Sequence, residues 1–320
     1  MTSLDQFSVW CLAREGCAET FTEKLLTHKH ELDMVEALTG AFTGTPLSVA
    51  AEYGRSEIVQ ICLENGANPN TVDICGRTPL YHAMTTDGLG ATMSLLRYKA
   101  DVSIPDKFGI TPLVKAIEKD LPGLVMLLVE NGADMSAKSM FGETSLHVAA
   151  SKGFLGCFTI LVEKGADLCA TDCYGKTVLH VAAERGSFGC MKILMDKGCN
   201  INCLDNHGVT PLHAAIRNGK EDSVRTLIHY DADPLTTDFG GETPFDNALA
   251  RECAVHHPSH KAVYRRPWST IRILVQEEIA WKHRVTRREA IAMSQHERLG
   301  GGSRLYQLDH GVIGMLAEYV

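Results

Sequence analysis

Apolar residues recur every three or four positions in short segments along the chain, and a threonine precedes each segment. In "TPLSVAAEYG", which begins at Thr45, the apolar Leu47, Ala50 and Ala51 would lie on one side of a helix. Threonine can cap a helix through its hydroxyl, and a proline that follows it has a φ angle suited to the first turn. Glycine, here Gly54, favours the left-handed conformation that ends many helices. The pattern therefore predicts a short amphipathic helix after each such threonine, followed by a second helix.

These segments recur with a period of thirty-three residues. Related sequences include "TSLHVAASKG", "TVLHVAAERG" and "TPLHAAIRNG", and the second helix of a unit ends in sequences such as "LVENGADM" and "LVEKGADL". One unit cannot bury its own apolar side, whereas neighbouring units that stack side by side can. The period therefore predicts an all-α solenoid. The threonines that mark the units are Thr45, Thr78, Thr111, Thr144, Thr177, Thr210 and Thr243.

The repeated sequences resemble the ankyrin repeat family, with its turn, two helices and Gly-Ala loop, over about residues 40–250. The resemblance implies an ankyrin-repeat α-solenoid of helix-turn-helix units with β-hairpin-like loops. It also implies a structural role for the histidines His147, His180 and His213, which occupy one position in successive units. We expect each to bond its threonine and neighbouring backbone groups rather than to bind a metal.

The regularity of the repeats sets the expected domain boundaries. Residues 1–39 have two helical periods without the Thr-Pro signature, which predicts a degenerate N-terminal helical cap. Residues 40–253 hold the repeats, with units starting near 40, 73, 106, 139, 172, 205 and 238. Residues 254–268 are too polar and aromatic to continue a helix pair, so we expect an inserted loop there. Residues 269–320 are expected to form a helical C-terminal extension.

Composition narrows the class of protein. The chain has 320 residues, 45% of them hydrophobic, so it can bury a sizeable core. Its formal net charge of −8 argues against a general binder of nucleic acid or anionic membranes, because such proteins concentrate lysine and arginine. No apolar run approaches the roughly 18 residues of a membrane span, and the first residues lack the features of an export signal. Eleven scattered cysteines are more typical of reduced thiols than of a disulfide framework. We expect a cytoplasmic or nuclear protein.

Two groups of residues suggest metal ligands, but each has a simpler interpretation. The cysteines form two C-x-x-x-C pairs at repeat positions where a small packing residue suffices. The histidines lie in the expected polar loop. No Gly-rich phosphate loop follows a strand, and no Ser, His and acid triad has a recognisable elbow. We therefore expect no enzymatic activity, no cofactor, no metal and no small-molecule substrate. The residues concerned are Cys169, Cys173, Cys199, Cys203, His256, His257 and His260.

Aromatic residues occupy equivalent turn positions in successive units. Phe108, Phe141 and Tyr174 each lie three residues before a capping threonine, so stacking should align them along the hairpin edge. Aromatic anchors contribute strongly to protein interfaces. The row therefore indicates a partner-binding site, and the alternative is mutual packing between adjacent turns.

Basic residues accompany the aromatic row. Lys119, Lys152 and Arg185 occupy one position near the end of three successive first helices, and in ankyrin-like proteins this position faces the concave groove. Arg77 and Lys176 directly precede capping threonines. An acidic or amphipathic protein segment would fit such a surface. The alternative is that these residues are the solvated ends of amphipathic helices.

The expected loop 254–268 adds a second candidate surface. Its sequence "YRRPW" contains Tyr264, Arg265, Arg266 and Trp268, a mixture of basic and aromatic residues that could contact a partner. The alternative is a solvated insertion.

These observations together predict a non-catalytic protein–protein interaction scaffold that binds a protein segment through its hairpin tips and concave groove. An alternative is a substrate adaptor of a ubiquitin ligase, because residues 286–320 loosely resemble the box helices of ankyrin adaptors. The same segment would otherwise fold back as a C-terminal cap.

Overall fold

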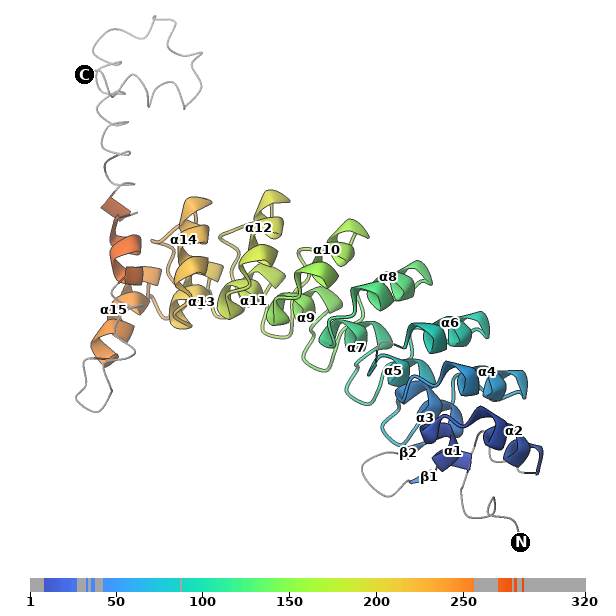
Figure 1. Cartoon of the computed structure of the whole chain (residues 1–320). Helices are drawn as coiled ribbons and strands as arrows, with labels where there is room; N and C mark the ends of the chain where they lie inside the picture. The colour runs from blue at the N-terminus through green and yellow to red at the C-terminus, as the bar shows by residue number, and fades with distance from the viewer. Residues whose placement is uncertain are drawn as a thin grey trace, which may run out of the picture. The chain divides into compact units, whose positions relative to one another are not determined.

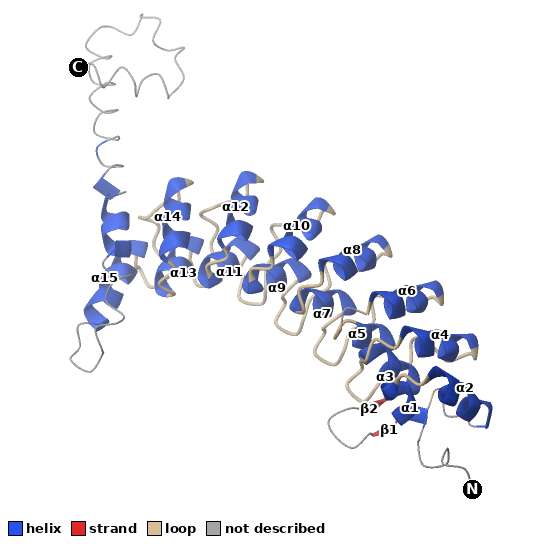
Figure 2. Cartoon of the chain, in the orientation of Figure 1, coloured by secondary structure: helices blue, strands red, loops and turns tan. Residues whose placement is uncertain are grey.

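The computed structural model describes residues 9–27, 33, 36–37, 43–86, 88–255, 270–277, 279–280 and 284. The chain divides into two compact units, Met1–Cys199 (unit 1) and Asn200–Val320 (unit 2), which are described separately. The described residues are predominantly helical (Figure 2). Strands β1 (Glu36–Ala37) and β2 (Thr43–Gly44) form a short antiparallel pair, with Glu36 opposite Gly44 and Ala37 opposite Thr43.

Unit 1 is built from consecutive helix pairs, and each pair contains a first and a second helix. Figure 1 shows the pairs following one another along the unit. The pairs are α1 (Val9–Glu15) with α2 (Ala18–Thr27), α3 (Pro46–Glu52) with α4 (Ser56–Glu64), α5 (Pro79–Ala83) with α6 (Leu89–Arg97), α7 (Pro112–Glu118) with α8 (Pro122–Glu130), α9 (Ser145–Lys152) with α10 (Leu155–Glu163), and α11 (Val178–Arg185) with α12 (Phe188–Asp196).

Neighbouring pairs in unit 1 bury their apolar sides against one another. The first helices α3, α5 and α7 pack in sequence, as do α7, α9 and α11, and the second helices α8, α10 and α12 follow the same order (Figure 1). The leucine two residues after each capping threonine is buried in every one of these first helices. This stacking confirms the predicted all-α ankyrin-repeat solenoid. The leucines are Leu47, Leu80, Leu113, Leu146 and Leu179.

The first helices of unit 1 begin where the threonines predict. The Thr45 hydroxyl accepts a hydrogen bond from the Ser48 amide at 3.1 Å, and the Thr78 hydroxyl accepts one from the Tyr81 amide at 3.1 Å. Proline follows both threonines and occupies the first helical turn. Local capping therefore fixes the start of each helix and, with it, the position of the turn that precedes it.

The structural role predicted for the repeated histidines is confirmed. In unit 1, His147 Nδ1 accepts a hydrogen bond from the Thr144 amide at 3.3 Å, so the ring proton lies on Nε2. That Nε2 donates to the Lys176 carbonyl at 3.1 Å, in the turn of the next repeat. His147 thus caps its own helix and holds the neighbouring turn, and His180 Nδ1 accepts the equivalent capping bond from the Thr177 amide at 3.1 Å. Burial lowers the pKa of His147, which favours the neutral ring.

The first helix pair of unit 1 covers the N-terminal side of the first repeat. Helix α1 packs against α3, and α2 packs against α4. The buried Trp10 indole donates a hydrogen bond to the Gly44 carbonyl at 2.9 Å, and Arg55 Nε donates to the Arg14 carbonyl at 3.1 Å. This pair lies within residues 1–39, for which we expected a cap without the Thr-Pro signature.

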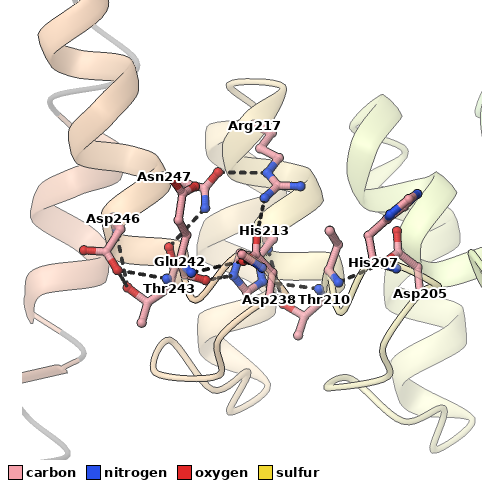
Figure 3. Close-up of polar contacts among 12 residues, drawn as sticks. Asp205, His207, Thr210, His213, Arg217, Asp238, Glu242, Thr243, Asp246 and Asn247 are labelled. Atoms are coloured by element: carbon pink, nitrogen blue, oxygen red, sulfur yellow. Dashed lines mark hydrogen bonds and ion pairs between the residues drawn. The ribbon is translucent and has the colours of Figure 1, made fainter.

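Unit 2 repeats the same construction with helices α13 (Pro211–Arg217), α14 (Glu221–His229) and α15 (Pro244–Val255). Figure 3 shows its capping network. His213 Nδ1 accepts from the Thr210 amide at 3.2 Å, and its Nε2 donates to the Glu242 carbonyl at 3.1 Å. From α13, Arg217 also reaches the side chains of Asn247, at 2.8 Å, and Asp238.

The end of unit 2 can be compared with the loop expected at residues 254–268 and the extension expected at residues 269–320. Helix α15 continues to Val255, so residues 254–255 are helical, and the rest of the expected loop lies outside the described residues. Tyr264, Arg265, Arg266 and Trp268 lie in that part. Residues 270–277, 279–280 and 284 are helical, in the expected C-terminal extension. Residues 286–320, on which the adaptor alternative depends, lie outside the described residues.

Candidate protein-binding surface

Unit 1 carries the two rows of residues that the sequence selects for partner binding. We call Phe108, Phe141 and Tyr174 the tip row, because each lies in the turn between a second helix and the next first helix. Figure 2 draws these turns as tan loops extending beyond the first helices. We call Lys119, Lys152 and Arg185 the basic row. Lys152 and Arg185 are the last residues of the first helices α9 and α11, and Lys119 directly follows the last residue of α7.

The tip-row side chains are largely open to solvent. Phe108, Phe141 and Tyr174 are 57%, 53% and 52% exposed, and no ring–ring contact joins them in the described part of the chain. Their turns are instead joined through the backbone. The Met140 amide donates to the Phe108 carbonyl at 3.1 Å, and the Cys173 amide donates to the Phe141 carbonyl at 3.0 Å. The backbone therefore aligns the tips and leaves the rings available for a ligand.

An acceptor side chain that the sequence analysis overlooked shapes each tip, and it is an aspartate in two of the three. Asp172 Oδ1 accepts hydrogen bonds from the amides of Tyr174, at 2.8 Å, and Lys176, at 2.9 Å, and Asp106 accepts equivalent bonds in the preceding repeat. Ser139 takes this position in the repeat between them, and its hydroxyl accepts at 3.3 Å. The signal was present in the sequence, because acceptors recur two residues before each tip residue.

The basic row lies at helix C-termini, where the helix dipole favours cations. Lys119, Lys152 and Arg185 are exposed, and no ion pair within 4.0 Å engages any of them among the described residues. Arg185 does influence Glu143: burial raises the pKa of Glu143, while the nearby arginine partly opposes that shift. The basic row therefore offers three cations to a ligand.

Two acids on the same first helices as the basic row, Glu118 and Glu184, are bound by other lysines. Lys115 Nζ lies 3.0 Å from Glu118 Oε2 and stands over the Tyr81 ring, 5.7 Å from its centroid. Lys176 Nζ lies 2.6 Å from Glu184 Oε2. Acids paired with other lysines thus lie on the same first helices as the unpaired cations of the basic row.

The other two basic candidates already have partners within the fold. Arg77 Nε donates to Asp73 Oδ2 at 2.8 Å, and Lys176 pairs with Glu184 as described above. Burial opposes ionisation of Asp73, but hydrogen bonds from His82 and from nearby amides, with the charge of Arg77, lower its pKa to about 2. Arg77 therefore supports its own tip, and a ligand would have to share it.

The remaining chemistry of the described residues is sparse. No group of three or more His, Cys, Asp or Glu side chains there could hold a metal ion. Cys169 and Cys173 are exposed, and Cys169 lines a surface pocket of about 290 Å³ with Lys138 and Asp167. His256, His257 and His260 lie outside the described residues. No helix in the described part of the chain is long and apolar enough to cross a membrane.

Comparison with known families agrees with this architecture. The family model for ankyrin repeats in three copies matches residues 86–172 and 168–238, and the model for ankyrin repeats in many copies matches residues 34–83. The chain belongs to the ankyrin-repeat family. Repeats of this family generally mediate protein–protein interaction and are generally non-catalytic.

Curated relatives match only parts of this chain. It is 45% identical over 53 residues to Neurogenic locus notch homolog protein 4 of Homo sapiens, and 37% over 76 residues to Neurogenic locus Notch protein of Drosophila melanogaster. It is 38% identical over 66 residues to Cyclin-dependent kinase inhibitor 2A of Monodelphis domestica. These matches cover 17%, 24% and 21% of this chain, and 3%, 3% and 38% of the respective relatives.

Proposed function

We propose that this protein is a non-catalytic interaction scaffold that binds an acidic or amphipathic protein segment across the tip row and basic row of unit 1. The observation that carries the proposal is the combination of three half-exposed aromatic rings with three unpaired cations on consecutive repeats. Aromatic side chains supply contact area at low entropic cost, and the cations select acidic partners.

Hydrogen bonds within and between the turns fix the backbone that carries the tip row. The aspartates and the backbone bonds between neighbouring tips hold the turns independently of the aromatic rings. A ligand would therefore meet side chains whose backbone positions are already set, so little ordering entropy is lost on binding.

The test compares proteins captured by the wild type with those captured by a Phe108→Ala, Phe141→Ala, Tyr174→Ala variant. We expect specific partners to be lost, because each ring is an exposed anchor whose removal leaves the fold intact. Circular dichroism and the thermal midpoint check that the variant stays folded.

A Leu26→Ala, Met93→Ala variant is the matched control. Both residues are exposed and apolar, at 81% and 55%, but lie on the second helices α2 and α6, away from the tips. If the tip variant retains every partner, or if the control loses the same partners, the proposed site is wrong.

A further inference from the structure

In unit 1 an exposed apolar residue follows each cation of the basic row at the same interval, across the short loop between paired helices. Three residues after Lys152 comes Leu155, and three after Arg185 comes Phe188, each the first residue of a second helix. Leu155 and Phe188 are 46% and 51% exposed. Pro122 has the same place after Lys119 and is also exposed. We call these six residues the loop edge.

Two apolar members of the loop edge, Pro122 and Leu155, lie close to the following repeat. A methyl group added to Gly156 would lie 3.8 Å from Pro122 Cβ, and one added to Gly189 would lie 3.0 Å from Leu155 Cδ1. Neither glycine has a positive φ angle, so its backbone conformation does not call for glycine. Gly189 instead leaves room for the Leu155 side chain, and Pro122 lies at ordinary contact distance from the position of that methyl group at Gly156, so Pro122 and Leu155 each extend toward the next repeat.

The charges along the loop edge favour an anionic ligand. Glu118 and Glu184, the acids nearest to it in sequence on the first helices, are held in ion pairs by Lys115 and Lys176. Asp120 lies in the loop between α7 and α8, where its carboxylate accepts a hydrogen bond from Cys157 Sγ at 3.5 Å. Glu143 also lies near Arg185, as described above, and the three cations of the basic row outnumber these two carboxylates.

The spacing between repeats selects the conformation of the ligand. Stacked helices lie about 8–10 Å apart, so the cations recur at about that interval. A polyproline II segment has three residues per turn and rises about 3.1 Å per residue, so every third side chain faces one way at about 9.3 Å intervals. On one face of a β-strand, side chains recur about every 6.6 Å, which does not match the interval between the cations. An α-helix rises about 1.5 Å per residue, so acids seven residues apart would recur about every 10.5 Å, slightly above that interval. The exposed Leu155 and Phe188 beside the cations favour the polyproline II segment, because such segments dock on apolar and aromatic side chains.

We propose that the loop edge binds an acidic polyproline II segment with a carboxylate at every third position and an apolar residue, such as proline, next to each carboxylate. This inference rests on the proposed function and specifies its ligand. One face of the segment meets the basic row. The adjacent face meets Pro122, Leu155 and Phe188.

The test uses fluorescently labelled peptides and the full chain, with binding followed by anisotropy at low salt. The probe is Glu-Pro-Ala-Glu-Pro-Ala-Glu-Pro-Ala-Glu. Its isomer, Glu-Ala-Glu-Ala-Glu-Ala-Glu-Pro-Pro-Pro, has the same composition with acids at every second position. We expect the probe to bind about tenfold more tightly, because its carboxylates reach all three cations and those of the isomer do not.

Variants of the chain identify the cations involved. The change Lys119→Glu, Lys152→Glu, Arg185→Glu should weaken binding of the probe at least about tenfold. The milder Lys119→Gln, Lys152→Gln, Arg185→Gln variant should weaken it in the same direction, with less effect on the helix C-termini. Lys192→Glu, an exposed change on the second helix α12, is the matched control and should leave binding unchanged.

Equal affinity for the two peptides, tighter binding of a helical peptide with acids every seven residues, or unchanged binding by both triple variants would each overturn this inference. The capture experiment tests the proposed function independently of the peptides. If captured partners depend on the tip row and basic row while the peptides do not differ, the scaffold proposal survives and the polyproline II ligand is wrong. If the variants also retain every partner, both proposals are wrong.

Discussion

Non-glycine residues adopt a left-handed backbone at three helix ends in the described chain. Lys99, Asp120 and Asp231 have φ angles of 61°, 54° and 64°. Lys99 follows α6, at the position where Gly66 follows α4 and Gly132 follows α8. Aspartate tolerates this conformation because its short side chain can bond locally, whereas lysine has no such compensation. Lys99 is therefore the position where glycine is most clearly missing.

We predict that Lys99→Gly stabilises the protein. Relief of the left-handed conformation is worth about 1–2 kcal/mol, and the greater freedom of glycine in the unfolded chain opposes it by about 0.5–1 kcal/mol. The net gain should be about 0.5–1 kcal/mol. A higher urea midpoint at an unchanged slope would measure it.

Lys197→Gly serves as the control for this change. Lys197 is likewise an exposed lysine at the end of a second helix, but its φ angle is −84°. Glycine relieves nothing there, so only its unfavourable entropy remains and the midpoint should fall. A Lys99→Gly protein that unfolds at a lower urea concentration than the wild type would contradict the prediction.

At the scale of helices and turns, the sequence predicts most boundaries because capping acts locally. Thr111 and Pro112 begin α7, and Gly153, with a φ angle of 73°, ends α9. Each signal involves only residues within a turn of the helix end, so one unit's sequence contains all the information needed.

Features that depend on neighbouring repeats were not predictable in this way. Arg77 and Lys176 could be placed on the groove, but their pairing with Asp73 and Glu184 depends on tertiary distances. The exposure of the tip row was not predictable either. Rings that pack against one another and rings that stay exposed on aligned turns would produce the same periodic sequence. The sequence therefore located the candidate surface without deciding which of its cations remain unpaired.

The histidine caps make the helices sensitive to pH. Burial lowers the folded-state pKa of His147 and of His213 below the ordinary 6.5. Their favourable contribution is therefore complete above pH 6.5 and decreases as the pH falls below it, because the unfolded chain then binds more protons. We predict that the free energy of unfolding decreases between pH 7.5 and 5.5, as measured by urea titration.

A His147→Gln, His213→Gln variant isolates this effect. Glutamine can cap a helix from the same position but does not titrate. The free energy of unfolding of this variant should therefore change less between pH 7.5 and 5.5 than that of the wild type. Burial raises the pKa of Glu52 and Glu143, so these two groups make the free energy of unfolding increase as the pH falls. They do so in both proteins, so their effect cancels when the variant is compared with the wild type. Identical pH profiles for variant and wild type would refute the histidine account.

At the scale of the molecule, stability in stacked repeats is mainly a sum of contacts between neighbours. Unit 1 illustrates the close fit that such contacts require. A methyl group added to Gly142 would lie 2.7 Å from the Cys173 nitrogen, in the tip of the next repeat. That nitrogen donates the hydrogen bond to Phe141 that aligns the two tips. A change at Gly142 should therefore act on the interface between two repeats.

We predict that Gly142→Ala lowers the free energy of unfolding by about 2–3 kcal/mol, of which about 1 kcal/mol is the left-handed backbone and the rest is lost contact between repeats. Gly132→Ala isolates the backbone part. Gly132 has a similar positive φ angle, 86° against 75°, but a methyl group there would meet nothing within 4 Å. Hydrogen exchange should then show faster exchange at the Cys173 amide in the first variant, with α3 and α4 unchanged in both. Equal losses of stability in the two variants would mean that the tips do not couple the repeats.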